Sequence, residues 1–311
     1  MKLLILILVS FILFVLYDKY HSKKSSLNIE TFQEDNRPKL WVYTDNSNHE
    51  YQPKCFDLSI KSIYRYCQEE FNIIQLSPDN IYSYLPDLPI NTGCLSETES
   101  SQQEQIIKTA IMYRYGGLWI PPNIIILQSL LPIISKLEDK EIVLFGCPDK
   151  NLRCFDSSLP DFNVVASRPY INMWNIVYQK LIKDNKKFLN SSFEYNNIGR
   201  KLLWENCKNM YDAIHIFDSK YDGTRDYNRK LITNDELFSN NNILLQDSKS
   251  CFFLIYNYNN IKKSTKYRWF LNLSLNELMT SNLWISKIYR LSLLGIDTTV
   301  NDVYNTSVRN T

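Results

Sequence analysis

A short unit in the middle of the chain combines a helical pattern, a double glycine and a double proline. Apolar residues recur at helical spacing as far as Tyr113, and the helix is expected to end at Gly116–Gly117. A strand then begins and is interrupted by Pro121–Pro122, so Asn123 is held outside regular strand pairing. Glycine lets the backbone turn sharply and approach a ligand closely. The same pattern is typical of an ordinary helix end before an edge strand, and local pattern alone leaves both interpretations open.

Polar residues at the ends of predicted strands are further candidates. Asp45 follows the expected strand Lys39–Thr44, and Asp161 comes just before a strand that starts at Asn163. Ligands of open α/β sheets bind beyond the carboxyl ends of strands, so Asp45 is a candidate binding residue. Asp161 and Asn163 could contact a substrate or form an ordinary turn, and both interpretations stay open.

Composition excludes several classes of function. The 311 residues are 44% hydrophobic and 22% charged, which is typical of a folded chain. A net charge of +2 without a basic stripe argues against nucleic acid as a partner. With three histidines, seven glycines and no Gly-rich phosphate motif, a multi-histidine metal site and a phosphate loop are not expected. His215 lies between two isoleucines of a predicted strand, and we expect it to be exposed or hydrogen-bonded, not a base.

Strands and helices alternate over residues 38–260, which predicts an α/β fold with parallel strand pairing. Strands are expected at Lys39–Thr44, Asn72–Leu76, Glu141–Cys147, Asn163–Ser167, Ala213–Asp218, 242–247 and 251–257. Helices are expected at Phe56–Tyr66, from Ser101 to Tyr115, near 171–186, near 198–210 and at 274–294. The polar stretch Ser96–Gln105 is expected to be a mobile loop, with Ser101 and Glu104 forming a capping box. Residues 261–311 are expected to form a helical extension and tail.

The segment QIIKTAIMYRYGGLWIPPNIIIL (105–127) resembles the central motif of the glycosyltransferase family 32 and capsular polysaccharide synthesis type enzymes. Their pattern runs S-D-x-x-R-x-x-x-L-Y-x-Y-G-G-I-Y-x-D-x-D, and Met112–Trp119 matches it in register. Arg37–Asp45 resembles the first strand of that family, and Leu159–Pro169 the region after the motif. The resemblance implies a GT-A-type fold, with a mixed, mainly parallel sheet flanked by helices. It also implies a nucleotide-sugar donor and, usually, bound Mn²⁺ or Mg²⁺.

The resemblance carries donor-binding roles over to one set of residues, in which Trp119 could stack on a base or sugar. They are Gln105, Lys108, Tyr115, Gly116, Gly117, Trp119 and Asn123. The Asp and Arg of S-D-x-x-R fall on Gln105 and Lys108, and the two aspartates of Asp-x-Asp fall on Pro121 and Asn123.

Two carboxylates hold the metal in the family's motif, where the cation neutralises the donor diphosphate. Proline supplies neither a charge nor a side-chain ligand, and Asn123 supplies only a neutral oxygen. No Asp or Glu lies between Glu104 and Glu138. The sequence therefore predicts no metal and no other cofactor.

Three hypotheses follow. The first is a metal-independent glycosyltransferase that moves a sugar from a nucleotide-sugar to a glycan or protein, with cationic side chains replacing the metal. The candidate cations are Lys108, Arg168, Lys262 and Lys263. The second is a catalytically inactive family member that binds a glycan or nucleotide, and the third is an interaction protein without a sugar ligand. Composition and the altered motif also resemble glycosyltransferase-like proteins of large AT-rich DNA viruses.

The N-terminus predicts a membrane anchor. Residues 3–17 are apolar except for Ser10 and carry no charge. A cleaved signal peptide is the alternative, but no A-x-A-like cleavage step follows. We expect an uncleaved anchor over 1–17, a stem over 18–37 and a single-pass protein of an endomembrane or virion membrane. The lysines after the segment favour a cytoplasmic body, whereas anchored sugar-transferring enzymes often have a lumenal one, so the side stays open.

Cysteines and sequons leave that side open too. Seven cysteines without a CxxC motif fit buried free thiols better than a disulfide framework. Sequons occur at Asn190, Asn272 and Asn305, but asparagine is so common here that chance sequons are expected.

Overall fold

The computed structural model describes residues 35–44, 52–89, 97–146, 161–188, 202–243, 245 and 250–295. The chain divides into Met1–Asn36 and Arg37–Thr311, and the second unit holds the fold described below. The predicted anchor, and the predicted stem as far as Glu34, lie outside the described residues. Within the ranges given above, no helix is long and apolar enough to cross a membrane.

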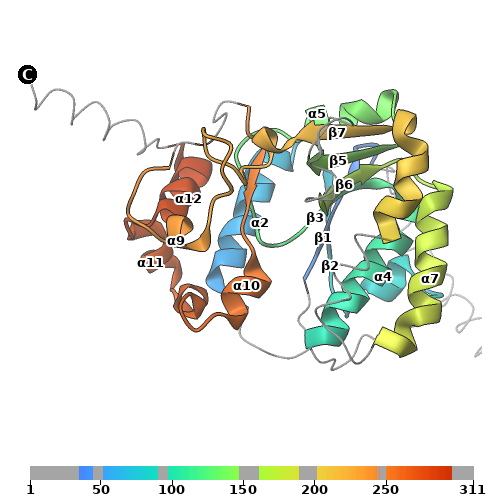
Figure 1. Ribbon diagram of the computed structural model, residues 1–311, viewed down its shortest axis with the longest axis horizontal. Coiled ribbons are helices and arrows are strands. Elements are labelled where there is room, and N and C mark those ends of the chain that lie inside the picture. Colours follow the sequence, from blue (N-terminus) through green and yellow to red (C-terminus); the bar gives the residue numbers. More distant parts are fainter. Residues whose placement is uncertain are drawn as a thin grey trace, which may run out of the picture. The chain divides into compact units, whose positions relative to one another are not determined.

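A six-stranded mixed sheet with the order β2-β1-β3-β6-β5-β7 forms the centre of the fold (Figure 1). Its strands are β1 (Lys39–Tyr43), β2 (Asn72–Leu76), β3 (Gly117–Ile120), β5 (Ile142–Gly146), β6 (Asp161–Ser167) and β7 (Ile214–Asp218). The β2–β1, β1–β3 and β5–β7 pairs are parallel, whereas β6 is antiparallel to both of its neighbours. Five strands therefore run the same way, and their carboxyl ends share one edge of the sheet.

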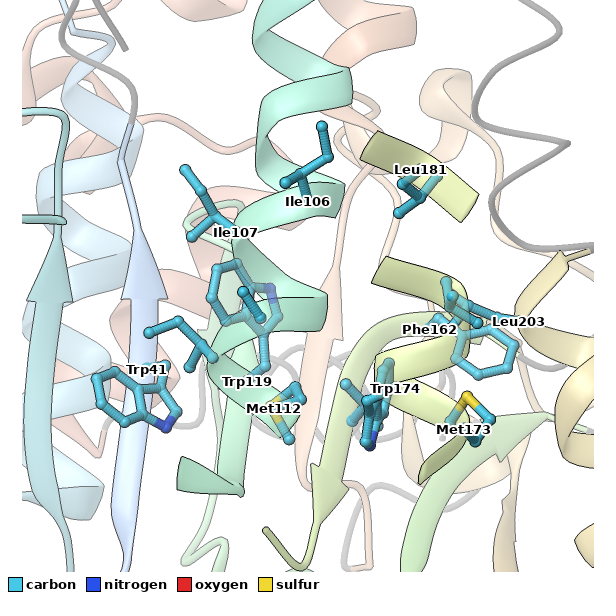
Figure 2. Packing of buried hydrophobic residues seen from close by; sticks show 14 of the residues in the cluster. Trp41, Ile106, Ile107, Met112, Trp119, Phe162, Met173, Trp174, Leu181 and Leu203 are labelled. Atoms are coloured by element: carbon cyan, nitrogen blue, oxygen red, sulfur yellow. The ribbon is translucent and has the colours of Figure 1, made fainter. Parts of the chain in front are cut away.

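Helices cover both faces of this sheet (Figure 1). The described helices before β7 are α2 (Lys54–Cys67), α3 (Ile81–Tyr84), α4 (Glu97–Tyr115), α5 (Leu131–Ser135), α7 (Asn172–Phe188) and 202–207. Turns of 3₁₀ helix occur at Lys136–Glu138, Lys208–Ala213 and, after β7, Ser219–Tyr221. On one face, α4 and α7 bury Trp41, Trp119 and Trp174 (Figure 2). On the other face, Ile63 and Cys67 of α2 pack on apolar side chains of β1 and β3.

A second, two-stranded antiparallel sheet joins β4 (Ile124–Ile126) to β8 (Phe253–Ile255). The outer side of β4 is completed by serines from two helices. The Ser62 hydroxyl of α2 accepts a hydrogen bond from the Ile126 amide at 3.0 Å, and the Ser292 hydroxyl donates to the Ile126 carbonyl at 2.6 Å. These bonds satisfy backbone groups that an edge strand would otherwise leave unpaired.

The C-terminal part is helical as far as the structure describes it. It comprises α9 (Asn234–Leu237), α10 (Tyr258–Lys263), the 3₁₀ helix η4 (Arg268–Asn272), α11 (Leu275–Thr280) and α12 (Trp284–Leu294). A third apolar cluster joins these helices to the far side of α2 and to β8. The buried Tyr289 hydroxyl donates to the Cys55 carbonyl at 3.0 Å, so the C-terminal helices are tied to α2 by a polar contact as well.

The predicted strands β1, β2, β5, β6, β7 and β8 are confirmed, as are the helices α2 and α7. The prediction of a loop at Ser96–Gln105 is wrong, because α4 already begins at Glu97 and Ser101 lies inside it instead of starting it. The stretch is rich in Glu and Gln, which are good helix formers, and it contains no Gly or Pro. The strand predicted at 242–247 falls partly outside the described residues, and within them only Leu245 makes a β-bridge.

The cysteines of the described ranges are buried free thiols, as expected: Cys55, Cys67, Cys207 and Cys251. Burial raises the pKa of Cys55 to about 11 and the pKa of Cys67 and Cys207 to about 12. A thiol with such a pKa is protonated at neutral pH and therefore a poor nucleophile.

Candidate functional site

The carboxyl edge of the six-stranded sheet is the candidate site. β1, β2 and β3 end there at Tyr43, Leu76 and Ile120, and β7 ends there at Asp218. β6 runs the other way and begins at this edge with Asp161, which pairs with Phe145. Ligands of open α/β sheets bind beyond this edge, because connections on opposite faces leave a crevice there.

The turn after β3 is tied to the small sheet. The side-chain amide of Asn123 donates a hydrogen bond to the Tyr256 carbonyl. The Tyr256 amide in turn donates to the Asn123 carbonyl at 3.3 Å. Asn123 therefore holds the residue after β8 against the carboxyl end of β3. In the resembling family this position carries an aspartate, which could not donate the first of these bonds once ionised.

We expect Asn123→Asp to lower the free energy of unfolding at neutral pH by about 1–3 kcal/mol, because a carboxylate would face the Tyr256 carbonyl without a proton to share. That contact raises the pKa of the new carboxyl in the folded state. The variant should therefore lose stability as the pH rises above the unfolded value of about 4, and regain it on acidification. Urea denaturation from pH 4 to pH 7 measures this.

Asn123→Ala is the matched control, because it removes the same hydrogen bond without adding a charge. Its loss of stability, relative to the natural chain, should not depend on pH in this range. An Asn123→Asp chain as stable as the natural one at pH 7 would show that the Asn123 side chain does not donate a hydrogen bond to the Tyr256 carbonyl.

The middle of α4 lies beside the carboxyl edge. Lys108 is only 1% exposed, and its ammonium donates to the carbonyl of Phe162, the second residue of β6, at 3.1 Å. Gln105 is half-buried one turn earlier on the same helix. The Gln103 side chain is 2% exposed, and its amide finds no hydrogen-bond partner within the described ranges. A buried amide in that state costs free energy until water or a ligand satisfies it.

Gly116 and Gly117 lie at the opposite, amino-terminal edge of the sheet. Their φ angles are +61° and +94°, which favour glycine. A Cβ on Gly116 would lie 2.5 Å from the Ser167 carbonyl oxygen, and one on Gly117 would lie 2.5 Å from that of Lys39. Glycine is therefore required at both positions, because the backbone of β6 lies against Gly116 and the backbone of β1 lies against Gly117. β3, whose four residues span about 10 Å, lies between this pair and the turn that carries Asn123.

Tyr115 belongs to the same amino edge. The centre of its ring lies 5.4 Å from that of Trp41, and its hydroxyl donates a hydrogen bond to the Tyr84 carbonyl at 2.8 Å. The ammonium of Lys39 lies 5.1 Å from the centre of the Tyr115 ring. These contacts join the end of α4 to α3 and β1, which accounts structurally for the aromatic part of the motif.

Trp119 lies in the core and not beside a cleft, which corrects the position expected for it. The side chain has no exposed surface and packs beneath α4 near Ile107 (Figure 2). Strand alternation directs Trp119 to the α4 face, whereas Leu118 and Ile120 face the other cluster. A ring without exposed surface cannot stack on a ligand in this conformation.

The remaining candidates divide between the edges. Asp45 lies outside the described residues, as does the side chain of Asp161, although its backbone opens β6. Asn163 is exposed near the carboxyl edge. Arg168 follows β6 at the amino edge, where its guanidinium donates to the Leu137 carbonyl at 2.6 Å and to that of Glu138.

His215 is half-buried instead of exposed, and it lies on the sheet face opposite Ile214 and Ile216. It packs edge-on against Phe217, and the centres of the two rings lie 4.5 Å apart. Burial, together with the nearby Lys136 and Lys140, lowers its pKa, which favours the neutral imidazole. It is the second residue of β7 and so lies away from the carboxyl edge.

Sequence reasoning missed Tyr256. It stands at the end of a predicted strand, so its position after a strand was recognisable. Its partner Asn123 is far away in the sequence, and no local pattern indicates that the two meet.

No family model matches this chain, and no curated protein matches it. Similar solved structures include the PaToxG glycosyltransferase, with 8% identity and a TM-score of 0.37 over 56% of this chain and 71% of that one. GlyE, a glycosyltransferase of Streptococcus pneumoniae TIGR4, has 14% identity and a TM-score of 0.45 over 88% of this chain. Mouse xyloside xylosyltransferase 1 in its apo form has 9% identity and a TM-score of 0.37 over 72% of this chain and 98% of that one.

This chain spans 64% of the length of the GlyE chain. Identities and TM-scores this low establish no shared activity. The function proposed below therefore depends on the residues of this chain and on the motif they resemble.

Proposed function

We propose that this chain is a glycosyltransferase of GT-A type, anchored to a membrane by residues 3–17, which binds a nucleotide-sugar at the carboxyl edge of its sheet and transfers the sugar to a glycan or protein. The observation that carries the proposal is the turn Pro121–Asn123. It follows β3 at the carboxyl edge, where the Asp-x-Asp of the resembling family would lie. Gln105 and Lys108 of the same motif lie in the middle turns of α4, beside that edge.

The residues at the motif positions do not fit a divalent cation. The Pro121 side chain has no ligating atom, and the Asn123 amide nitrogen is engaged by the Tyr256 carbonyl. Only a neutral amide oxygen remains, whereas Mn²⁺ and Mg²⁺ are held by carboxylates in such sites. We propose that transfer proceeds without a metal and that side-chain cations stabilise the departing diphosphate.

Lys262 and Lys263 are the best candidates for that role. They lie in the last turn of α10. This helix begins two residues after Tyr256, the residue that is hydrogen-bonded to Asn123. The other cations considered lie elsewhere, since Lys108 is buried against β6 and Arg168 lies at the amino edge. As the bond from the anomeric carbon to the diphosphate breaks, two ammonium groups would compensate the charge that develops on the leaving oxygen.

Thermal unfolding of the chain with a panel of nucleotide-sugars tests the proposal. One donor should raise the unfolding temperature equally with Mn²⁺ and with EDTA, and a ligand at a hundred times its Kd stabilises by about 2.7 kcal/mol. Lys262→Ala combined with Lys263→Ala should weaken donor binding about tenfold or more, because a hydrogen bond to a charged group contributes about 1.5–3 kcal/mol. The chain should also transfer the sugar of that donor to an acceptor or to water.

Lys136→Ala is the matched control, since this exposed lysine lies in the turn before β5, at the amino edge. It should leave donor affinity unchanged. Stabilisation without turnover would favour the inactive binding protein, and a shift that requires Mn²⁺ would refute the metal-free mechanism. No shift with any donor would overturn the proposed function.

A further inference from the structure

The outer face of η4 presents an asparagine sequon beside an exposed tryptophan. η4 buries Phe270 and Leu271 in the C-terminal apolar cluster and exposes Trp269 and Asn272. Asn272-Leu273-Ser274 matches the acceptor pattern for N-linked glycosylation. The Asn272 side chain makes no hydrogen bond within the described ranges, so a glycan on its amide nitrogen would displace no contact of the fold.

The 3₁₀ geometry brings these two side chains together. In a 3₁₀ helix the side chains of residues i and i+3 are eclipsed, and Trp269 and Asn272 have this spacing. The Trp269 ring is 42% exposed, and its centre lies 5.6 Å from that of Phe238, which holds it at the surface. A sugar on Asn272 would therefore meet an anchored aromatic face, on which the apolar C–H side of a pyranose ring can be buried.

From this arrangement we infer that Asn272 is an N-glycosylation site, with the first N-acetylglucosamine packed on Trp269. The inference goes beyond the proposed activity and concerns modification of the chain itself. The co-reactant is a lipid diphosphate oligosaccharide, used by the oligosaccharyl transferase of the endomembrane lumen. The Asn272 amide nitrogen forms a bond to the anomeric carbon, the bond from that carbon to the diphosphate oxygen breaks, and the amide loses one proton. The lipid diphosphate departs, and nothing is oxidised or reduced.

Ser274 has a second role in the folded chain. It is the N-cap of α11, where its hydroxyl donates to the Glu277 carboxylate at 2.7 Å and accepts from the Glu277 amide at 3.2 Å. Glycosylation of a chain during translocation precedes this contact, so the two roles do not compete. A glycan on Asn272 would also establish that the unit Arg37–Thr311 lies on the lumenal side of the membrane.

The experiment expresses the full chain in cells with N-glycosylation, in a background that carries Asn190→Gln and Asn305→Gln so that only the Asn272 sequon remains. An N-glycosidase should then increase the gel mobility by one glycan step. Asn272→Gln should abolish the step, whereas the control Asn276→Gln, at an exposed asparagine outside any sequon, should retain it. Ser274→Thr should keep it as well. A background chain without the step overturns the inference, whatever the result with nucleotide-sugars.

A second measurement tests the contact with Trp269. The glycosylated chain should unfold at a higher temperature than its Asn272→Gln counterpart. In a Trp269→Ala chain the same comparison should give no difference, although the glycan is still attached. A stabilisation that survives Trp269→Ala would overturn the packing of the sugar on the indole ring.

Discussion

Replacing Gly117 with alanine is expected to lower the free energy of unfolding by more than about 4 kcal/mol, a loss large enough to prevent folding of many domains. The new Cβ would lie 2.5 Å from the Lys39 carbonyl oxygen and 3.1 Å from the Trp41 indole nitrogen. Neither neighbour can yield easily, because Lys39 opens β1 and the Trp41 indole donates to the Gly116 carbonyl at 2.8 Å. Equilibrium denaturation, or the yield of soluble chain, measures this effect.

Gly295→Ala is the matched control. Gly295 also has a positive φ, +69°, but among the described residues its Cβ would find only one side-chain atom of Arg65 within reach, at 3.8 Å. This change should cost about 1 kcal/mol, the conformational penalty alone. A loss of stability for Gly117→Ala as small as that for Gly295→Ala would show that β3 does not approach β1 so closely. A Gly117→Ala chain that folds normally and loses only donor binding would instead show that Gly117 lines the donor pocket.

Trp119→Ala is expected to destabilise the chain by about 3–5 kcal/mol, the usual cost of emptying the space of a fully buried tryptophan. The ring lies between the sheet and α4, so a cavity there cannot be filled from solvent. The measurement is the free energy of unfolding, compared with nucleotide-sugar affinity at a temperature where the variant is folded. A residue that stacks on the ligand would show the opposite pattern, with normal stability and lost affinity.

Phenylalanine substitutions separate packing from hydrogen bonding at this position. The Trp119 indole nitrogen has no hydrogen-bond partner among the described residues, whereas that of the equally buried Trp174 donates to the Ser167 hydroxyl at 2.8 Å. Trp174→Phe should therefore cost about 1 kcal/mol more than Trp119→Phe. Equal costs would indicate that the Trp119 nitrogen has a partner after all.

Parts of the candidate site could be read from the sequence because they depend on local patterns. The apolar stretches and their spacing predicted β3 and the helical second half of α4, and the two prolines predicted the break before Asn123. The polar first half of α4 was misread, since Gln102 and Gln103 look like surface residues but are buried in the structure. Burial depends on what packs against a helix, and neighbouring residues in the sequence do not reveal that.

The sequence by itself determined that the chain alternates strands with helices, that a helix ends at Gly116–Gly117, and that the motif lacks its metal-binding carboxylates. Only the tertiary structure decided what these features are next to. The glycines face the backbone of β1 and β6, Trp119 faces the core, and Asn123 is joined to Tyr256. A residue type and its spacing limit the conformation and chemistry that are possible, but its partners come from distant segments that meet only when the sheet assembles.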